Sequence, residues 1–157
     1  MKKGFTLIEV IIYIGLFSLL LGTAFVSVYQ LIDSSAKLSV KSTAEEEGNF
    51  AMRKLNWALS SIDLSTTPTI SGSDCTQSIS INKVDTSISP VVFRLNTVGG
   101  INYLEIQKNG GTFYPITTSN VTVSCLKFSK TTGSPAGITS TVTINGVDFS
   151  VTKYIRK

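Results

Sequence analysis

The chain has 157 residues, a net charge of +4 and no histidine. This length suits one compact domain with an appendage, and it is too short for two ordinary domains. The lack of histidine excludes His-dependent catalytic triads, histidine metal ligands and histidine proton shuttles. No nucleophile elbow, phosphate loop or paired-carboxylate motif is evident, so we expect no catalytic residue, metal or cofactor. The basic residues are scattered along the sequence, which gives no clear nucleic-acid site.

The N-terminal segment 5–32 is almost wholly apolar and follows Lys2 and Lys3. No charged residue lies between Val10 and Val28, and a helix of this length covers roughly the 30 Å of a bilayer core. The two lysines hold the start of the chain on the cytoplasmic side, because moving ammonium groups through hydrocarbon is costly. A plain membrane anchor does not explain Glu9, a carboxylate at the edge of the apolar run that needs a partner charge if it is buried.

The residues Gly4-Phe5-Thr6-Leu7-Ile8-Glu9 resemble the prepilin processing motif of type IV pilins and type II secretion pseudopilins. The resemblance implies that a prepilin peptidase cuts between Gly4 and Phe5, that residues 1–4 are a leader peptide, and that Phe5 is then N-methylated. It also implies that Glu9 meets the N-terminal ammonium of a neighbouring subunit during filament assembly. The implied partners are the inner membrane, the peptidase, other pilin subunits and the pilus assembly machinery.

A different processing site is also possible in this segment. Gly22-Thr23-Ala24 fits the small-x-small pattern of ordinary signal peptidase sites, and such a cut would leave a chain that begins at Phe25. This alternative leaves Gly4, Phe5 and Glu9 without a role.

Beyond the apolar segment, the sequence predicts that the same helix continues through residues 33–62. No proline occurs before Pro68, and apolar residues recur at intervals of three, four and seven. This stripe should pack on the β-rich remainder of the chain. Phe50 and Trp57 lie one heptad apart on its flank, and we expect them to pack in the core. The stripe consists of Val40, Ala44, Ala51, Leu55, Ala58 and Ile62.

Three glycines, Gly15, Gly22 and Gly48, interrupt the predicted helix. They permit either bending or close helix packing. The apolar half has no proline, whereas many major pilins resemble one another in having one there. This departure favours a minor pilin or a pseudopilin.

The remainder, residues 63–157, is predicted to be an extracytoplasmic β-rich head that begins with a loop at 65–74. The gaps between strands are too short for crossover helices, so the sheet should be mainly antiparallel. Pro115 should lie on an edge strand or in no strand. Asn109-Gly110 and Asn145-Gly146 are hairpin signals. Strands are expected at 78–83, 91–96, 102–108, 112–116, 121–129, 140–145 and 147–153.

The two cysteines, Cys75 and Cys125, lie outside the apolar segment and have no Cys-x-x-Cys spacing. In an exported domain they favour a single disulfide, and in a cytosolic protein they would be two buried free thiols. The predicted class is therefore α+β, with a long N-terminal helix packed on a mainly antiparallel sheet, as in type IV pilins.

The resemblance implies a structural subunit of a type IV pilus or related filament, most simply a minor pilin. Its precursor would be a single-pass protein of the inner membrane, and the assembled filament would be periplasmic or on the cell surface. The alternatives are a type II secretion pseudopilin and a membrane-anchored adhesin that does not polymerise. Arg53, Asn56 and Trp57 near the helix end resemble the PilW, GspJ and ComGF branch. The sequence does not identify a ligand of the head.

Overall fold

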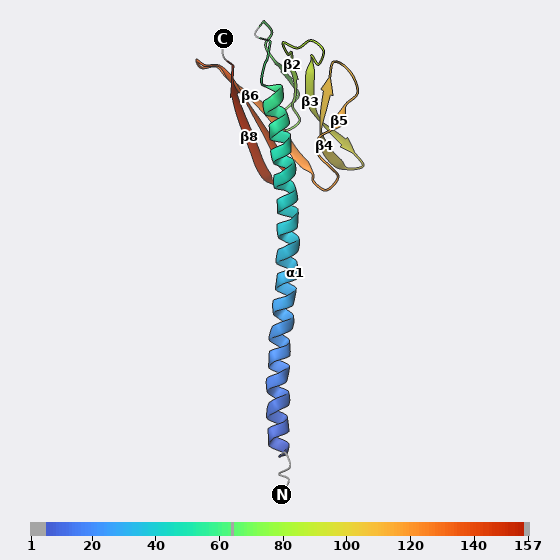
Figure 1. The fold of residues 1–157 in the computed structure, drawn as a ribbon, viewed down its shortest axis with the longest axis vertical. Coiled ribbons are helices and arrows are strands. Elements are labelled where there is room, and N and C mark those ends of the chain that lie inside the picture. Colours follow the sequence, from blue (N-terminus) through green and yellow to red (C-terminus); the bar gives the residue numbers. More distant parts are fainter. Residues whose placement is uncertain (1–5, 64, 156–157) are drawn as a thin grey trace. The chain divides into compact units, whose positions relative to one another are not determined.

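The computed structural model describes residues 6–63 and 65–155 of the chain. It forms two compact units, Met1–Val40 and Lys41–Lys157. The described part contains the helix α1 (Leu7–Ala58) and the strands β1 (Thr69–Ser71), β2 (Ser78–Ile81), β3 (Val91–Val98), β4 (Ile101–Lys108), β5 (Tyr114–Pro115), β6 (Val123–Thr131), β7 (Gly137–Ile144) and β8 (Val147–Tyr154) (Figure 1). A long N-terminal helix and antiparallel strands confirm the predicted α+β class.

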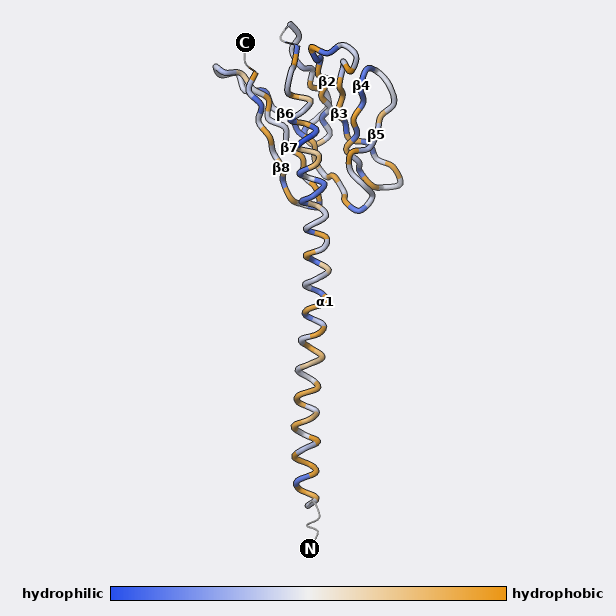
Figure 2. The backbone as a smooth tube through the Cα atoms, viewed as in Figure 1, coloured by the Kyte–Doolittle hydropathy of each residue, from blue (hydrophilic) through white to orange (hydrophobic). Residues whose placement is uncertain are grey.

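The described part of the first unit is residues 6–40, which include α1 from Leu7 to Val40. Its apolar side chains lie on every side of the helix, and Figure 2 shows hydrophobic residues following one another along this part of the chain. Every described residue of this unit is exposed. A helix that is apolar all round needs a lipid or protein environment to cover it.

The strands of the second unit form two antiparallel sheets, where the sequence predicted one. Strands β1 to β5 pair in chain order, and β6, β7 and β8 form the other sheet (Figure 1). Alternating burial along a strand indicates which face is covered, but it does not determine which strands exchange hydrogen bonds. That choice depends on tertiary contacts, which explains the error.

The predicted strands all exist, with shifted ends. Pro115 lies in β5, a two-residue strand at the edge of the first sheet, as proline's missing N–H requires. The expected loop at 65–74 contains the short edge strand β1, which the Ser- and Thr-rich sequence did not reveal. Asn109-Gly110 and Asn145-Gly146 both have positive φ at the two positions, as a type I′ turn needs.

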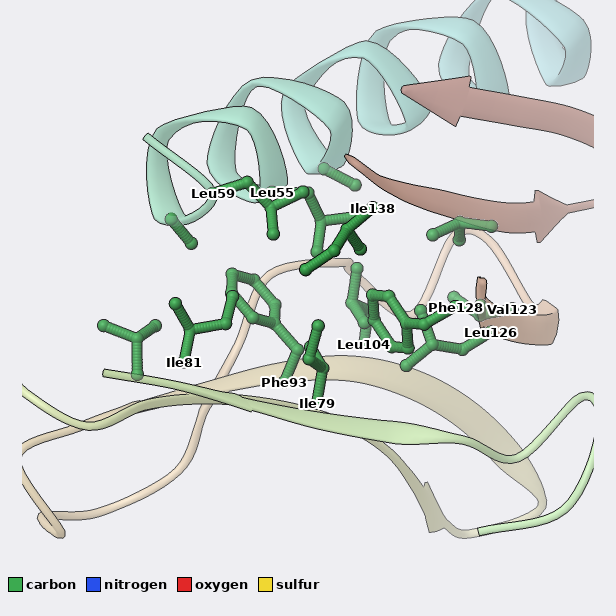
Figure 3. Close-up of a cluster of buried hydrophobic side chains, with 14 of the residues drawn as sticks. Leu55, Leu59, Ile79, Ile81, Phe93, Leu104, Val123, Leu126, Phe128 and Ile138 are labelled. Atoms are coloured by element: carbon green, nitrogen blue, oxygen red, sulfur yellow. The ribbon is translucent and has the colours of Figure 1, made fainter. Parts of the chain in front are cut away.

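The core of the second unit forms where the last turns of α1 meet both sheets. Leu55 and Leu59 point from the helix segment toward Ile79, Ile81 and Phe93 in the close-up of Figure 3. The stripe is confirmed for four helical residues, which are buried: Ala44, Ala51, Leu55 and Ala58.

Two members of the predicted stripe behave differently. Val40 is 57% exposed, and Ile62 is buried but lies beyond the helix, in an isolated bridge with Lys83. The helix ends at Ala58 because the chain turns away through Ser61, whose φ is 58°. Ile62 therefore joins the core from an extended segment.

The absence of a side chain at Gly48 allows α1 to lie close to the second sheet. The ring of Phe149 occupies the place where a β-carbon at Gly48 would stand. Gly15 and Gly22 have open space at that place. Close packing is therefore the role of Gly48 in this fold.

Candidate functional site

The first turn of α1 contains Glu9, which accepts two hydrogen bonds from Thr6. The Thr6 backbone N–H lies 3.2 Å from Oε2 of Glu9, and the Thr6 hydroxyl lies 3.1 Å from the same oxygen. Thr6 directly precedes the helix and Glu9 is its third residue, which is the spacing of a capping box. The pattern Thr-x-x-Glu is visible in the sequence, and the sequence analysis missed this local role. Gly4 and Phe5 lie outside the described residues.

The helix surface beyond Glu9 is apolar. Eighteen large hydrophobic side chains between Leu7 and Ile32 are exposed. By length and composition α1 can cross a membrane, with a most apolar window of mean hydropathy 2.2. These features fit a single-pass membrane-anchored protein.

The carboxylate of Glu9 can bind a cation in this apolar setting. A carboxylate among apolar side chains is stable when a cation meets it, and removing water strengthens that attraction. Its hydrogen bonds to Thr6 satisfy one of its two oxygens and supply no positive charge. An ammonium from another chain could bind the carboxylate at this place.

Cys75 and Cys125 form a disulfide that links the loop between β1 and β2 to β6. Their Cα atoms are 4.3 Å apart, and Leu126 N–H donates to the Cys75 carbonyl at 2.8 Å. Beside the disulfide, Lys127 pairs with Asp74 at 2.8 Å. The hydrogen bond from Lys127, and then its positive charge, lower the pKa of Asp74 below its usual value. Because the disulfide closes a 50-residue separation, it restrains the unfolded chain strongly.

The C-terminal end of α1 is capped by Lys83, a role that the sequence analysis missed. Its ammonium donates to the carbonyls of Trp57 at 2.8 Å, Ala58 at 3.3 Å and Ser60 at 2.6 Å. It also lies 4.4 Å from the Trp57 ring centroid. Burial lowers the pKa of Lys83, and the negative charge of Asp85 opposes that change. The helix has no basic residue in its own last turn, so Lys83 supplies the cation that the carbonyl end favours.

The prediction that Phe50 and Trp57 pack in the core is wrong. Their side chains are 39% and 38% exposed, and they line a pocket of about 470 Å³ together with Arg53, Lys54 and Lys108. The buried stripe at Ala51, Leu55 and Ala58 faces the sheets, which leaves this flank of the helix outside the core. Heptad spacing places two residues on one side of a helix, but it does not state which side is covered.

Among residues 6–63 and 65–155, no group of three or more Cys, Asp or Glu side chains lies close enough to hold a metal ion. The most specific features of this part of the chain are therefore the apolar helix with Glu9, the disulfide, the Lys83 cap and the pocket between Phe50 and Trp57.

Comparison with known proteins adds one finding. Residues 1–25 match the family model described as the prokaryotic N-terminal methylation motif. No curated protein and no solved structure matches the chain. The matched segment contains the Gly4–Phe5 junction, Glu9 and the first half of the exposed apolar helix.

Proposed function

We propose that this chain, which carries the N-terminal methylation motif of type IV pilins and pseudopilins on a pilin-like α+β architecture, is a minor pilin of a type IV pilus or related filament. In this proposal a prepilin peptidase removes residues 1–4 and Phe5 becomes the methylated first residue. The apolar helix first anchors the subunit in the inner membrane and then packs in the filament core. The β-rich second unit is the extracytoplasmic head.

The exposed apolar surface of residues 7–32 is the observation that carries the proposal. Eighteen large hydrophobic side chains would be unfavourable in water, at about 25 cal/mol for each Å² of apolar surface. A bilayer covers such a helix in the precursor. Neighbouring helices of the same kind would cover it in a filament, where packing between apolar surfaces requires no chemistry in the subunit.

The position of Glu9 supports assembly over simple anchoring. The cap to Thr6 would serve any helix, but burial of an unpaired charge in a bilayer is costly, so anchoring alone does not favour a carboxylate beside the apolar run. After cleavage, the fifth residue of the mature chain would be Glu9, and the N-terminal ammonium of a neighbouring subunit would neutralise it. Such a pair would set the register of one subunit against the next.

Replacing Glu9 by glutamine tests this role without removing the helix cap. Glutamine also serves in a capping box, so Glu9→Gln keeps the acceptor for Thr6 and removes only the charge. We expect incorporation into filaments, measured by crosslinking and immunoblotting of sheared fibres, to fall at least about tenfold, or ~1.4 kcal/mol. Asp33→Asn removes a carboxylate that pairs with Lys37 on the same helix, and it should leave incorporation unchanged. Full incorporation of Glu9→Gln would contradict the charge role.

Mass spectrometry of the mature N-terminus tests the processing separately. A chain that begins at methylated Phe5 supports the proposal. A chain that begins at Phe25 indicates signal peptidase cleavage, and one that retains Met1 indicates no processing.

A type II secretion pseudopilin is the second candidate, because the same methylation motif occurs in both kinds of filament protein. Deletion of the protein from its cell distinguishes a pilin from a pseudopilin by the property that the cell loses. Loss of surface fibres or of fibre-dependent behaviour indicates a pilin, and loss of secretion of folded enzymes indicates a pseudopilin. A protein found on the surface without any fibre would instead be a non-polymerising adhesin.

A further inference from the structure

The pocket between Phe50 and Trp57 gathers basic residues that are dispersed in the sequence. Arg53 and Lys54 lie on α1 between the two aromatic residues, and Lys108 comes from the end of β4. All three cationic side chains are exposed. The fold therefore creates a local positive surface that the linear order of residues does not display.

The cations of this pocket lie over aromatic rings, and among the described residues they form no ion pair with a carboxylate. Lys54 Nζ lies 5.1 Å and Arg53 Cζ 6.0 Å from the Phe50 ring centroid, and Lys108 Nζ lies 4.9 Å from that of Trp57. Within the part of the chain that the structure describes, none of the ion pairs involves these three residues. Cation–π contacts orient the cations and leave their charge unneutralised. Three net positive charges thus surround two half-exposed rings.

The spacing along α1 suits an extended chain with repeating units. Phe50 and Trp57 are seven residues apart, which is a rise of roughly 10 Å along the helix. A ligand lying along this side would meet the Phe50 ring with the Arg53 and Lys54 cations at it, and then the Trp57 ring with the Lys108 cation at it. A well-matched ligand therefore offers a negative charge and a flat apolar face together in each repeat.

We propose that this pocket binds single-stranded nucleic acid. Each nucleotide carries one phosphate and one base, so a strand supplies both features in every repeat. Basic grooves with exposed aromatic rings bind single strands through phosphate contacts and base stacking, with little dependence on sequence. A duplex hides its base faces in its own stack, and an acidic polypeptide has charge without the flat faces.

Lys83 lies against Trp57 without lining the pocket. Its buried ammonium contacts the Trp57 ring and the Trp57 carbonyl, which holds this residue at the last turn of the helix. Lys83 is 6% exposed, so its charge is directed to the helix end and not to a ligand in solvent. It is a positioning residue in this proposal.

The tryptophan itself reports the proposed contact. Trp57 is the only tryptophan of the chain, so its fluorescence measures one place. The probe is a fluorescein-labelled oligothymidylate of about twelve nucleotides, within the usual range of single-strand site sizes. The processed full-length chain in nonionic detergent micelles should bind it, as measured by anisotropy, and an unlabelled oligothymidylate of the same length should quench Trp57.

Variants that remove either positive charge or an aromatic ring separate the contributions of phosphate contacts and base stacking to binding. The double variant Lys54→Ala/Lys108→Ala should lower the slope of log affinity against log salt by about 1.4, which corresponds to two lost phosphate contacts. The control Lys37→Ala/Lys130→Ala removes the same charge from exposed positions outside the pocket and should bind as the parent does. Phe50→Ala keeps the reporter and should weaken binding at least about fivefold through lost stacking.

Three results would overturn the proposal: no quenching of Trp57 at saturating oligothymidylate, equal affinity for polyglutamate or a DNA duplex, or binding of the Lys54→Ala/Lys108→Ala variant that matches the control pair. Circular dichroism of each variant checks that the second unit is folded. The inference does not depend on filament assembly. Glu9→Gln should bind the oligothymidylate normally, even where it fails to enter fibres, so that the two proposals fail independently.

Discussion

At the scale of single residues, contacts with spatial neighbours determine what a side chain does in this chain. Lysine is usually an exposed residue, yet Lys83 is only 6% exposed. Its ammonium donates hydrogen bonds to three carbonyls at and just beyond the end of α1, which makes this burial possible. Glu9 combines a local helix cap, which the Thr-x-x-Glu spacing encodes, with the proposed assembly charge. Motif reasoning identified Glu9 but could not identify Lys83, since 23 to 26 residues separate it from the carbonyls that it contacts.

Replacing Lys83 by methionine tests the helix cap. Methionine keeps the length of the apolar stem and removes the ammonium, which leaves the carbonyls of Trp57, Ala58 and Ser60 without this donor. We expect a loss of about 1–3 kcal/mol in the free energy of unfolding, measured by urea denaturation of the detergent-solubilised chain. Lys130→Met, at an exposed position on β6, should change it by less than about 0.5 kcal/mol. Equal stability of both variants would show that the cap contributes little.

At the scale of elements, α1 contains two kinds of surface in one continuous helix. Its first part is exposed and apolar on all sides, and its last turns bury a narrow stripe of mainly small residues against the sheets. The small size of Ala44, Gly48 and Ala51 permits close approach of the strands. The periodicity predicted four buried helical residues of this stripe, whereas the exposure of Phe50 and Trp57 depended on which side of the helix the sheets cover.

Gly48 gives a test of that close approach. Alanine is favoured over glycine by about 1 kcal/mol in a helix interior, but its β-carbon would overlap the Phe149 ring. Overpacking usually costs about 1–3 kcal/mol, which offsets or exceeds this gain, so we expect Gly48→Ala to lower the free energy of unfolding by up to about 2 kcal/mol. Gly22→Ala, where the space is open, is the matched control and should lack this penalty. Stabilisation by Gly48→Ala would mean that Phe149 moves aside at little cost.

At the scale of the whole molecule, the stability of the second unit depends on the contacts that join its two sheets. The disulfide between Cys75 and Cys125 and the bridge between Thr76 and Leu126 connect the segment before β2 to β6. The core residues of both sheets then meet the end of α1. Each sheet covers its apolar face with the other and with the helix, because neither face can remain in water.

Reduction of the disulfide tests its share of this stability. In the entropy model, a loop of this length stabilises the fold by about 4 kcal/mol, so reduced protein should unfold at much lower urea. The Cys75→Ser/Cys125→Ser variant should behave like reduced protein. Asp74→Asn, which removes the adjacent exposed ion pair with Lys127, should shift the urea midpoint much less than reduction does, because solvent screens exposed charges. Equal urea midpoints of the oxidised and reduced protein would indicate that the packed core alone holds the sheets together.

The sequence by itself determined the apolar helix, its amphipathic continuation, the approximate strands and the two Asn-Gly turns, because these depend on local periodicity and backbone preference. It also displayed the N-terminal methylation motif, which residues 1–25 match. Only the tertiary structure decided the division into two sheets, the capping by Lys83 and the exposure of Phe50 and Trp57 beside Lys108. These features join residues that are distant in the chain, and their contacts arise from how complementary surfaces pack, which no short stretch of sequence encodes.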